Sequence, residues 1–360
     1  MKIFANYIEP EALEQVHTVS KMDIFKDSKI RIMPDVHAGA GCVIGFTADL
    51  VGYAVPNLVG VDIGCGVLTI EVDKDFKSFA LLDEIIKNNI PSGFNVHKQI
   101  ISELYRGHNS LQLIGEIERV CKDILKEDPT RHLHSIGTLG GGNHFIEWNE
   151  GKVYNYLVIH SGSRNFGHKI ATHYQKKAIE KCSANVPKEL KYLEGKDAED
   201  YLRDMKVAQE FAVANRGVIG TVIVDKLNIK FRNNWETVHN FIDESNIIRK
   251  GAISAAFGEY VTIPINMRDG SIIGRGKGNP DWNYSAPHGA GRLMSRNQAK
   301  RNLDLEEFKK EMTGIYSSTI SEDTLDEAPM AYKPIDSILD KLKETVEIVD
   351  IIKPLYNFKG

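Results

Sequence analysis

Asp62 and Cys65 form the first pair of side chains in the sequence whose types and spacing could bind a metal. They lie three residues apart, and glycines at 64 and 66 flank the cysteine, so one turn can bring both side chains to one point. A thiolate can bridge metal ions, and a carboxylate supplies a hard oxygen ligand. The alternative is a cysteine buried in a strand beside an aspartate in a turn, because free cysteines most often pack in the core.

A second segment combines three glycines with a histidine. Residues 140 to 142 are all glycine, and Asn143, His144 and Glu147 follow them. Such a run lets the backbone approach a ligand closely and turns its N–H groups toward phosphate oxygens. The alternative is a glycine turn that leads into a strand, with Glu147 in solvent.

Two more histidines complete a possible ligand set. His160 ends the apolar stretch from 156 to 160 and leads into a glycine turn with Arg164, while His239 precedes Asn240. A histidine at the end of a strand is well placed to bind a metal, and Arg164 would face the same opening. Taken singly, His160 is more often a hydrogen-bonded core residue, and His239 more often an exposed one.

His288 stands in the most specific segment, which reads Pro287-His288-Gly289-Ala290-Gly291-Arg292. The glycines leave one side of the histidine open to a reactant. Arg292 and Arg296 are four residues apart and would share one face of a helix, where their guanidinium groups could bind phosphate. The alternative is a glycine loop before a basic helix start. With the other segments, this one favours metal-assisted phosphoryl or nucleotidyl transfer.

Composition and motifs exclude several other classes. The 360 residues are 42% hydrophobic and 26% charged, as in a globular protein, and 45 basic against 49 acidic residues give a net charge of −4. A globally basic nucleic-acid binder is excluded, whereas a local basic cleft is not. The sequence has no Walker A motif, no His-Glu-x-x-His and no Cys-x-x-Cys. We found neither a signal core nor an apolar run of about 18 residues, which predicts a cytoplasmic protein without membrane contact.

The elements that must position these residues read as mixed helices and strands without βαβ regularity, which predicts an α+β fold. Short strands fill the first 75 residues, and others lie near 156–160 and 260–263. Helices are expected over 110–126 with Ser110 as N-cap, from His168 for about four turns, over 200–226, 304–312 and 335–345. Residues 181–200 read as an exposed excursion, and the apolar tail 351–358 as docked. Because the site residues scatter along the chain, we expect a single domain, 1–360.

The motifs together resemble those of the RtcB family of RNA-splicing ligases. The resemblance rests on Met33-Pro34-Asp35-Val36-His37, Val61 to Gly66, Gly142-Asn143-His144-Phe145, His160 to Arg164, His288 to Arg292, Pro329-Met330-Ala331-Tyr332-Lys333 and Lys359-Gly360. It runs from about residue 31 to the last residue, and the motifs keep the order of the family. It implies the RtcB-like α+β fold, with metal and nucleotide in one central cleft.

The family joins an RNA 3′-phosphate or 2′,3′-cyclic phosphate to a 5′-hydroxyl, in RNA repair or tRNA splicing, with GTP and two Mn²⁺ ions per site. By resemblance His288 is the histidine that carries GMP. The implied metal ligands are Asp62, Cys65, His144, His160 and His239. The implied guanylate and triphosphate contacts are Asn143, Glu147, Asn240, Gly289, Ala290, Gly291, Arg292 and Lys359. Arg164, Lys250 and Arg296 match basic positions proposed to hold RNA phosphates.

Two features depart from the family pattern. The chain is shorter than typical members, which resembles a compact branch linked with a release-factor-like protein; archease is the other partner the family suggests. The guanylate-side loop, usually Pro-Gly-Ser-Met-Gly, is replaced by residues 264–270, Pro-Ile-Asn-Met-Arg-Asp-Gly. In addition, one cysteine with three histidines would by ligand softness favour zinc, so manganese follows from the resemblance only.

Two other functions stay open at this point. One is a dinuclear metal phosphoesterase that cleaves RNA ends, in which His288 would be a ligand or an acid. The other is a non-catalytic RNA-binding module, against which Asp62, Cys65 and His288 argue.

Overall fold

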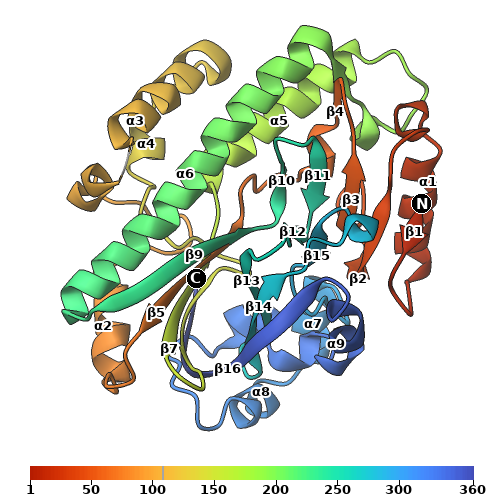
Figure 1. Cartoon of the computed structure of the whole chain (residues 1–360). Coiled ribbons are helices and arrows are strands. Elements are labelled where there is room, and N and C mark those ends of the chain that lie inside the picture. The colour runs from red at the N-terminus through yellow and green to blue at the C-terminus, as the bar shows by residue number, and fades with distance from the viewer. Residues whose placement is uncertain (108) are drawn as a thin grey trace.

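The computed structural model describes residues 1–107 and 109–360 (Figure 1). The strands are β1 (Lys2–Ile3), β2 (Arg31–His37), β3 (Ile44–Asp49), β4 (Tyr53–Ala54), β5 (Gly66–Val72), β6 (Phe145–Glu150), β7 (Asn155–Ser161), β8 (Leu193–Glu194), β9 (Phe231–Val238), β10 (Asn240–Ile242), β11 (Ile247–Lys250), β12 (Ala252–Ser254), β13 (Tyr260–Asn266), β14 (Gly270–Gly276), β15 (Ser285–Pro287) and β16 (Val346–Lys359). The helices are α1 (Pro10–Ser20), α2 (Phe79–Asn89), α3 (Ser110–Arg119), α4 (Thr130–Leu133), α5 (Arg164–Lys181), α6 (Gly195–Leu227), α7 (Arg296–Asn302), α8 (Leu305–Glu311) and α9 (Asp336–Leu342).

Two sheets organise the fold, which is α+β as predicted. Among the described residues, the larger sheet has seven strands in the order β13-β14-β16-β6-β7-β5-β9, and the smaller has five in the order β1-β2-β3-β11-β10. β9 ends at Val238 and β10 begins at Asn240, so one residue joins the two sheets. That residue is His239.

The register of the larger sheet gathers the predicted ligands at one edge. β7 is antiparallel to both neighbours, and His160 near its end faces Val67 of β5 and Phe145 of β6. The residues just before β5 and β6 therefore lie beside the end of β7, as does the residue after β9. Cys65 and His144 are close to His160 because an antiparallel ladder places one strand's end opposite its neighbour's start.

α6 is the central helix of the fold and lies diagonally beside β5 and β9 in Figure 1, with α5 along it. By length and composition it could cross a membrane, so the expectation that no segment is apolar enough is wrong. Most of its apolar stretch is nevertheless buried, with Tyr201, Phe211 and Ile219 among the fully buried residues. This is the behaviour of a core helix.

Several helices and one loop segment have different boundaries from those predicted. α5 begins at Arg164 rather than His168, and α6 begins at Gly195. The predicted helix over 110–126 has Asn109, not Ser110, at its N-cap and becomes a π-helical turn over Val120–Leu125. The segment 181–200 is not a free excursion, because β8 pairs with β4 and Leu190 is buried.

The two ends of the chain also depart from or extend the prediction. α1 was not predicted among the first 75 residues. Its signals are Pro10 at the first helical position, followed by the buried helical stripe of Ala12, Val16 and Val19. The tail is docked as predicted, since β16 lies between β14 and β6. Its last paired residue, Lys359, faces Phe145, so the C-terminus reaches the edge where the ligands gather.

Asp204 of α6 should contribute strongly to the free energy of unfolding. It is fully buried and accepts hydrogen bonds from Arg119 of α3 at 2.8 Å, from Tyr174 of α5 at 2.5 Å and from Arg203 of α6 at 3.0 Å. Asp204→Ala leaves all three donors without this acceptor and should cost about 3 kcal/mol in urea unfolding. Asp340 is exposed, and Asp340→Ala removes only its ion pair with Lys343. This substitution should change the free energy of unfolding by less than about 0.5 kcal/mol. Similar values for both variants would contradict this role.

Candidate functional site

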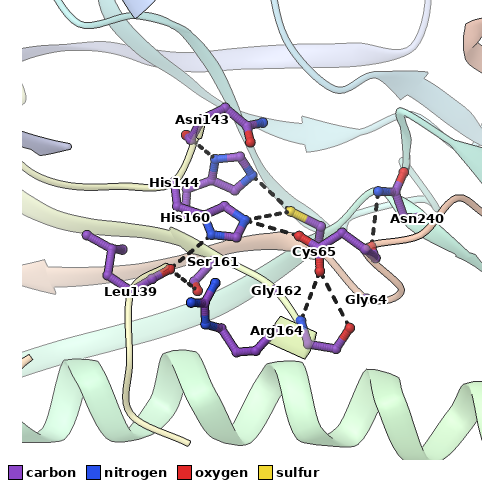
Figure 2. Close-up of polar contacts among 12 residues, drawn as sticks. Gly64, Cys65, Leu139, Asn143, His144, His160, Ser161, Gly162, Arg164 and Asn240 are labelled. Atoms are coloured by element: carbon purple, nitrogen blue, oxygen red, sulfur yellow. Dashed lines mark hydrogen bonds and ion pairs between the residues drawn. The ribbon is translucent and has the colours of Figure 1, made fainter. Parts of the chain in front are cut away.

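The predicted ligands meet in one largely buried cluster, in which Figure 2 labels Cys65, His144 and His160. The Cys65 Sγ lies 3.3 Å from His160 Nε2 and 3.6 Å from His144 Nε2, and Asp62 Oδ2 lies 3.1 Å from His144 Nε2. His239 joins from the sheet junction, with its ring centroid 5.2 Å from that of His160. All five predicted metal ligands are therefore brought together, although they come from positions 62 to 239.

Two backbone carbonyls orient the imidazole rings toward the cysteine. His144 Nδ1 donates to the Leu139 carbonyl at 2.9 Å, and His160 Nδ1 donates to the Asn143 carbonyl at 3.0 Å. These bonds place the ring proton on Nδ1 and leave each Nε2 lone pair facing the thiol. This is the arrangement that holds metal-binding histidines in one tautomer.

The donor atoms fall into two triads that share the cysteine, Cys65 with His160 and His239, and Cys65 with Asp62 and His144. Within each triad the donor atoms lie within 4.8 Å of one another. Burial, with neighbouring positive groups, lowers the pKa of His160 and His239 well below the usual value, so both are neutral as ligands must be. Burial raises the pKa of the Cys65 thiol, which a bound cation would reverse. The donor set fits two metal ions bridged by a thiolate.

A third triad lies on other elements and was not predicted. Cys121, Glu127 and His132 also place their donor atoms within 4.8 Å of one another. There, however, Glu127 is paired with Lys169 and accepts from His132 Nε2 at 2.6 Å. The contacts are those of an ion-paired network that ties α4 to α5.

Two positions at the cluster require glycine, because a polar side chain packs directly against the backbone there. A Cβ at Gly162 would lie 2.2 Å from Asp62 Oδ1, and a Cβ at Gly140 would lie 1.7 Å from the Arg164 guanidinium. The Gly162 position lets Asp62 accept from the Ser163 N–H at 3.1 Å. The glycine turns read from the sequence thus serve to bring a carboxylate and a guanidinium close to the backbone.

His288 lies beside the metal ligands and is oriented by a residue that the site prediction did not include. Its Nδ1 donates to Asp35 Oδ2 at 2.7 Å, and its ring centroid is 5.0 Å from that of His239. Asp35 is fully buried on β2. With Nδ1 occupied, Nε2 is the ring atom free to react. The sequence signal was present in the motif from Met33 to His37, but its distance of 253 residues from His288 concealed the contact.

A cavity of about 210 Å³ opens in front of His288. Its predicted lining residues are Asn143, Glu147, Gly289, Ala290, Gly291, Arg292, Arg296 and Lys359, with His160 and His239 at the metal side. Burial is the main reason that the pKa of Glu147 is raised to about 7. A larger groove of about 890 Å³, between α3, α6 and β9, contains none of the predicted ligands.

Glu327 gathers the positive side chains of the cavity. It contacts Lys359 Nζ at 2.8 Å, Arg296 at 2.9 Å and Arg292 at 3.2 Å, and accepts from the Tyr332 hydroxyl at 2.6 Å. Burial would raise its pKa, but Lys359 and Arg296 lower it to about 2. Arg292 and Arg296 do not share a helix face as predicted, because Ser295 caps α7 and Arg292 precedes it; they meet through Glu327 instead.

Three residues that were predicted to bind nucleotide or RNA form hydrogen bonds with backbone groups of the protein instead. Asn240 donates to the Asp62 carbonyl at 3.1 Å and accepts from Gly251 N–H at 3.0 Å. Lys250 is buried and donates to the Ala40 carbonyl at 2.7 Å, and burial lowers its pKa. Arg164 donates to the Gly93 carbonyl at 2.7 Å. Asn240 thus holds the Asp62 turn, and Lys250 lies within the fold rather than on an open surface.

Two adjacent residues of α6, missed from the sequence, hold the ligand segments. Asn215 accepts from the Gly137 and Thr138 N–H groups and donates to the Gly162 carbonyl. Arg216 donates to the carbonyls of Gly64 at 2.9 Å and Ser161 at 2.7 Å, and to Glu236 at 2.7 Å. Gly64 directly precedes Cys65, and Ser161 directly follows His160. Thr138 and Glu236 lie a few residues before His144 and His239. The sequence could have indicated them, because Asn215 and Arg216 are polar residues at positions where α6 otherwise buries apolar side chains.

A ligand set that could hold two metal ions, beside a histidine and a cavity lined with cations, is typical of enzymes that transfer phosphoryl or nucleotidyl groups. The chain belongs to the RtcB family: the family profile described as "tRNA-splicing ligase RtcB" matches residues 15–360.

Individual relatives agree over nearly the whole length. RNA-splicing ligase RtcB of Escherichia coli K12 is 31% identical over 390 residues, which cover 98% of this chain and 95% of the relative. tRNA-splicing ligase RtcB of Nanoarchaeum equitans is 29% identical over 450 residues, with 100% and 94% covered. That of Aeropyrum pernix is 30% identical over 402 residues, with 85% and 82% covered.

Arg216→Met should weaken metal binding although it removes no ligand. The substitution keeps an unbranched side chain but loses the bonds to the carbonyls beside Cys65 and His160, and second-shell losses of this kind typically cost ~10- to 100-fold in metal affinity. Mn²⁺ titration by calorimetry measures the effect, with a melting curve to verify folding. Arg203→Met is the matched control, because Arg203 lies on α6 but points to Asp200 and Asp204. An unchanged affinity in Arg216→Met would refute the assignment.

Proposed function

We propose that this protein is an RNA ligase that uses GTP and Mn²⁺ to join an RNA 3′-phosphate or 2′,3′-cyclic phosphate to a 5′-hydroxyl, through GMP bound to His288. The observation that carries the proposal is the position of His288. Asp35 holds its Nδ1 and leaves its Nε2 available, and the ring lies beside His239 of the candidate ligand set and lines the cavity. Membership in the RtcB family supports the same reaction.

The first step is an in-line displacement at phosphorus. The neutral His288 Nε2 attacks the α-phosphorus of GTP, an N–P bond forms, and pyrophosphate leaves with the electrons of the broken P–O bond. Asp35 accepts the Nδ1 hydrogen bond and stabilises the positive charge that develops on the ring, as a carboxylate does for an attacking or proton-carrying histidine. Transfer of GMP to an RNA 3′-phosphate would then create a good leaving group for attack by the 5′-hydroxyl.

The cavity suits guanine better than adenine. An ionised Glu147 can accept both N–H groups of the guanine Watson–Crick edge, and the Lys359 ammonium can donate to its O6. Adenine offers a donor where Lys359 needs an acceptor. Asn149 and Asn357 donate to the Glu147 carboxylate at 3.3 and 2.7 Å and fix its plane.

The ligand set would hold two divalent cations, which neutralise triphosphate charge and orient the α-phosphate. The softness of one cysteine and three histidines favours zinc, so the identity of Mn²⁺ rests on the family resemblance. Arg296, which is 41% exposed, is the candidate for an RNA phosphate contact at the cavity. Lys250, by contrast, would need to leave a buried site to reach RNA.

His288→Ala should abolish covalent labelling by radioactive GTP and Mn²⁺ while metal binding persists. The variant removes the attacking nitrogen but none of the five ligands. The control is His168→Ala, which removes an exposed histidine of α5 and should keep the label. The label should be acid-labile, as a phosphoramidate is. Label remaining on His288→Ala would disprove the assignment, and a wild type that never labels but removes RNA end phosphates would instead indicate a phosphoesterase.

GTP affinity should depend on pH through Glu147. Its pKa of about 7 in the folded protein means that the carboxyl is protonated below pH 7 and cannot then accept both guanine N–H groups. Affinity should therefore rise from pH 6 to pH 8, by at most tenfold per unit below the pKa. Titration of wild type beside Glu147→Gln isolates this group from the ionisation of the nucleotide, because the variant should bind more weakly and lack the Glu147 component. Parallel pH profiles for both proteins would count against it.

A further inference from the structure

Phe94 is an apolar ring held almost entirely in solvent. It is 94% exposed, in the segment Pro91-Ser92-Gly93-Phe94-Asn95-Val96 that follows α2. Leaving a phenylalanine uncovered forgoes about 1.5–3 kcal/mol of burial. An exposed ring in a loose loop would need no explanation, but this segment is firmly attached.

The backbone of the segment is bonded to the chain that leads to His144. Gly93 N–H donates to the Gly140 carbonyl at 2.8 Å, and Leu139 N–H donates to the Pro91 carbonyl at 2.9 Å. Two guanidinium groups complete the attachment: Arg164 donates to the Gly93 carbonyl at 2.7 Å, and Arg131 to the Phe94 carbonyl at 3.0 Å. The ring is thus presented from a fixed position, and little loop entropy remains to be lost on binding.

The same contacts place Phe94 at the edge of the candidate active site. The Gly93 Cα lies 3.9 Å from the Cβ position of Gly141, and the Cβ position of Gly142 lies 3.6 Å from the Arg296 guanidinium. Phe94 is the next residue after Gly93, so its Cα is within about 8 Å of the glycine run, which ends just before Asn143. In Figure 2 Arg164, whose guanidinium donates to the Gly93 carbonyl, lies beside the ligand cluster.

We infer that Phe94 is a stacking platform for an unpaired RNA base next to the strand break. The inference rests on the proposed function and adds to it the recognition of a single-stranded nucleotide. Base stacking on an aromatic ring is the usual way in which proteins hold unpaired RNA bases, and it needs no particular sequence. Arg131, exposed beside the ring, supplies a cation for the adjoining phosphate. A fixed, exposed ring beside a site that must bind two RNA ends fits this use.

The test measures binding of wild type and Phe94→Ala, without GTP, to nicked RNA hairpins that carry unpaired nucleotides on either side of the break. Phe94→Ala should bind ~5- to 150-fold more weakly, which corresponds to the stacking energy of one base. Replacing the stacked nucleotide by an abasic one should remove this difference, and Phe94→Trp should restore binding. Phe257→Ala is the matched control, because Phe257 is an 88% exposed ring in the turn between β12 and β13. 5-Iodouridine at the stacked position should photocrosslink to a peptide containing Phe94.

Equal RNA affinity for wild type and Phe94→Ala at every nucleotide position would overturn the inference and leave the ring for a protein partner. Loss of affinity that persists with the abasic RNA would also overturn it, because the effect would not be stacking. GMP labelling of the wild type without RNA is scored separately. Failure of that labelling would remove the ligase reaction, whereas the RNA measurements would still decide the role of Phe94.

Discussion

The buried hydrogen bonds of Asn215 and Arg216 are the constraint on which the site depends. The candidate metal ligands come from four segments at one edge of the larger sheet: Asp62 and Cys65 precede β5, His144 precedes β6, His160 lies near the end of β7, and His239 follows β9. One turn of α6 contacts all four, through the carbonyls of Gly64, Ser161 and Gly162, the N–H groups of Gly137 and Thr138, and Glu236. A guanidinium suits this role because its rigid donors bind two carbonyls and a carboxylate together. The central helix is therefore part of the site as well as of the core.

Charge is distributed locally rather than over the whole surface. The net charge of −4 gives no general attraction for RNA, yet Arg292, Arg296 and Lys359 converge on one cavity. Such a group would repel itself if it were unpaired, and Glu327 prevents this with a carboxylate whose pKa is about 2. Arg296 also pairs with Asp326 at 2.9 Å, so two carboxylates hold the three cations in place in front of His288. Cations that converge on one cavity can attract phosphate even on an acidic protein.

What could be predicted from sequence follows the range of the interactions. The ligands Asp62, Cys65, His144 and His160 were predictable because glycines mark each one locally, and the α+β class followed from the order of the elements. Partners such as Asp35 and Arg216 were not, since a contact between β2 and His288 or between α6 and Gly64 has no local pattern. Lys250 shows that a local pattern can also mislead. Arg249 and Lys250 before Gly251 are typical of an exposed basic pair, but β11 pairs within the smaller sheet and both side chains are buried. The start of α1, with Pro10 and a regular stripe, was readable and was overlooked.

The junction of the two sheets links His288 to the candidate metal ligands. Asp35 lies on β2 of the smaller sheet, and His288 follows β15, which pairs with β12 in a separate two-stranded sheet. Cys65 precedes β5 and His160 lies on β7, both in the larger sheet. His239 bridges them: its N–H donates to the Cys65 carbonyl at 3.0 Å, and its own carbonyl accepts from Gly251 at 2.8 Å. Gly251 precedes β12, which pairs with the strand that ends just before His288. Because His239 is the one residue between β9 and β10 and is hydrogen-bonded on both sides, it links the segment of Cys65 to the strand that pairs with the segment before His288.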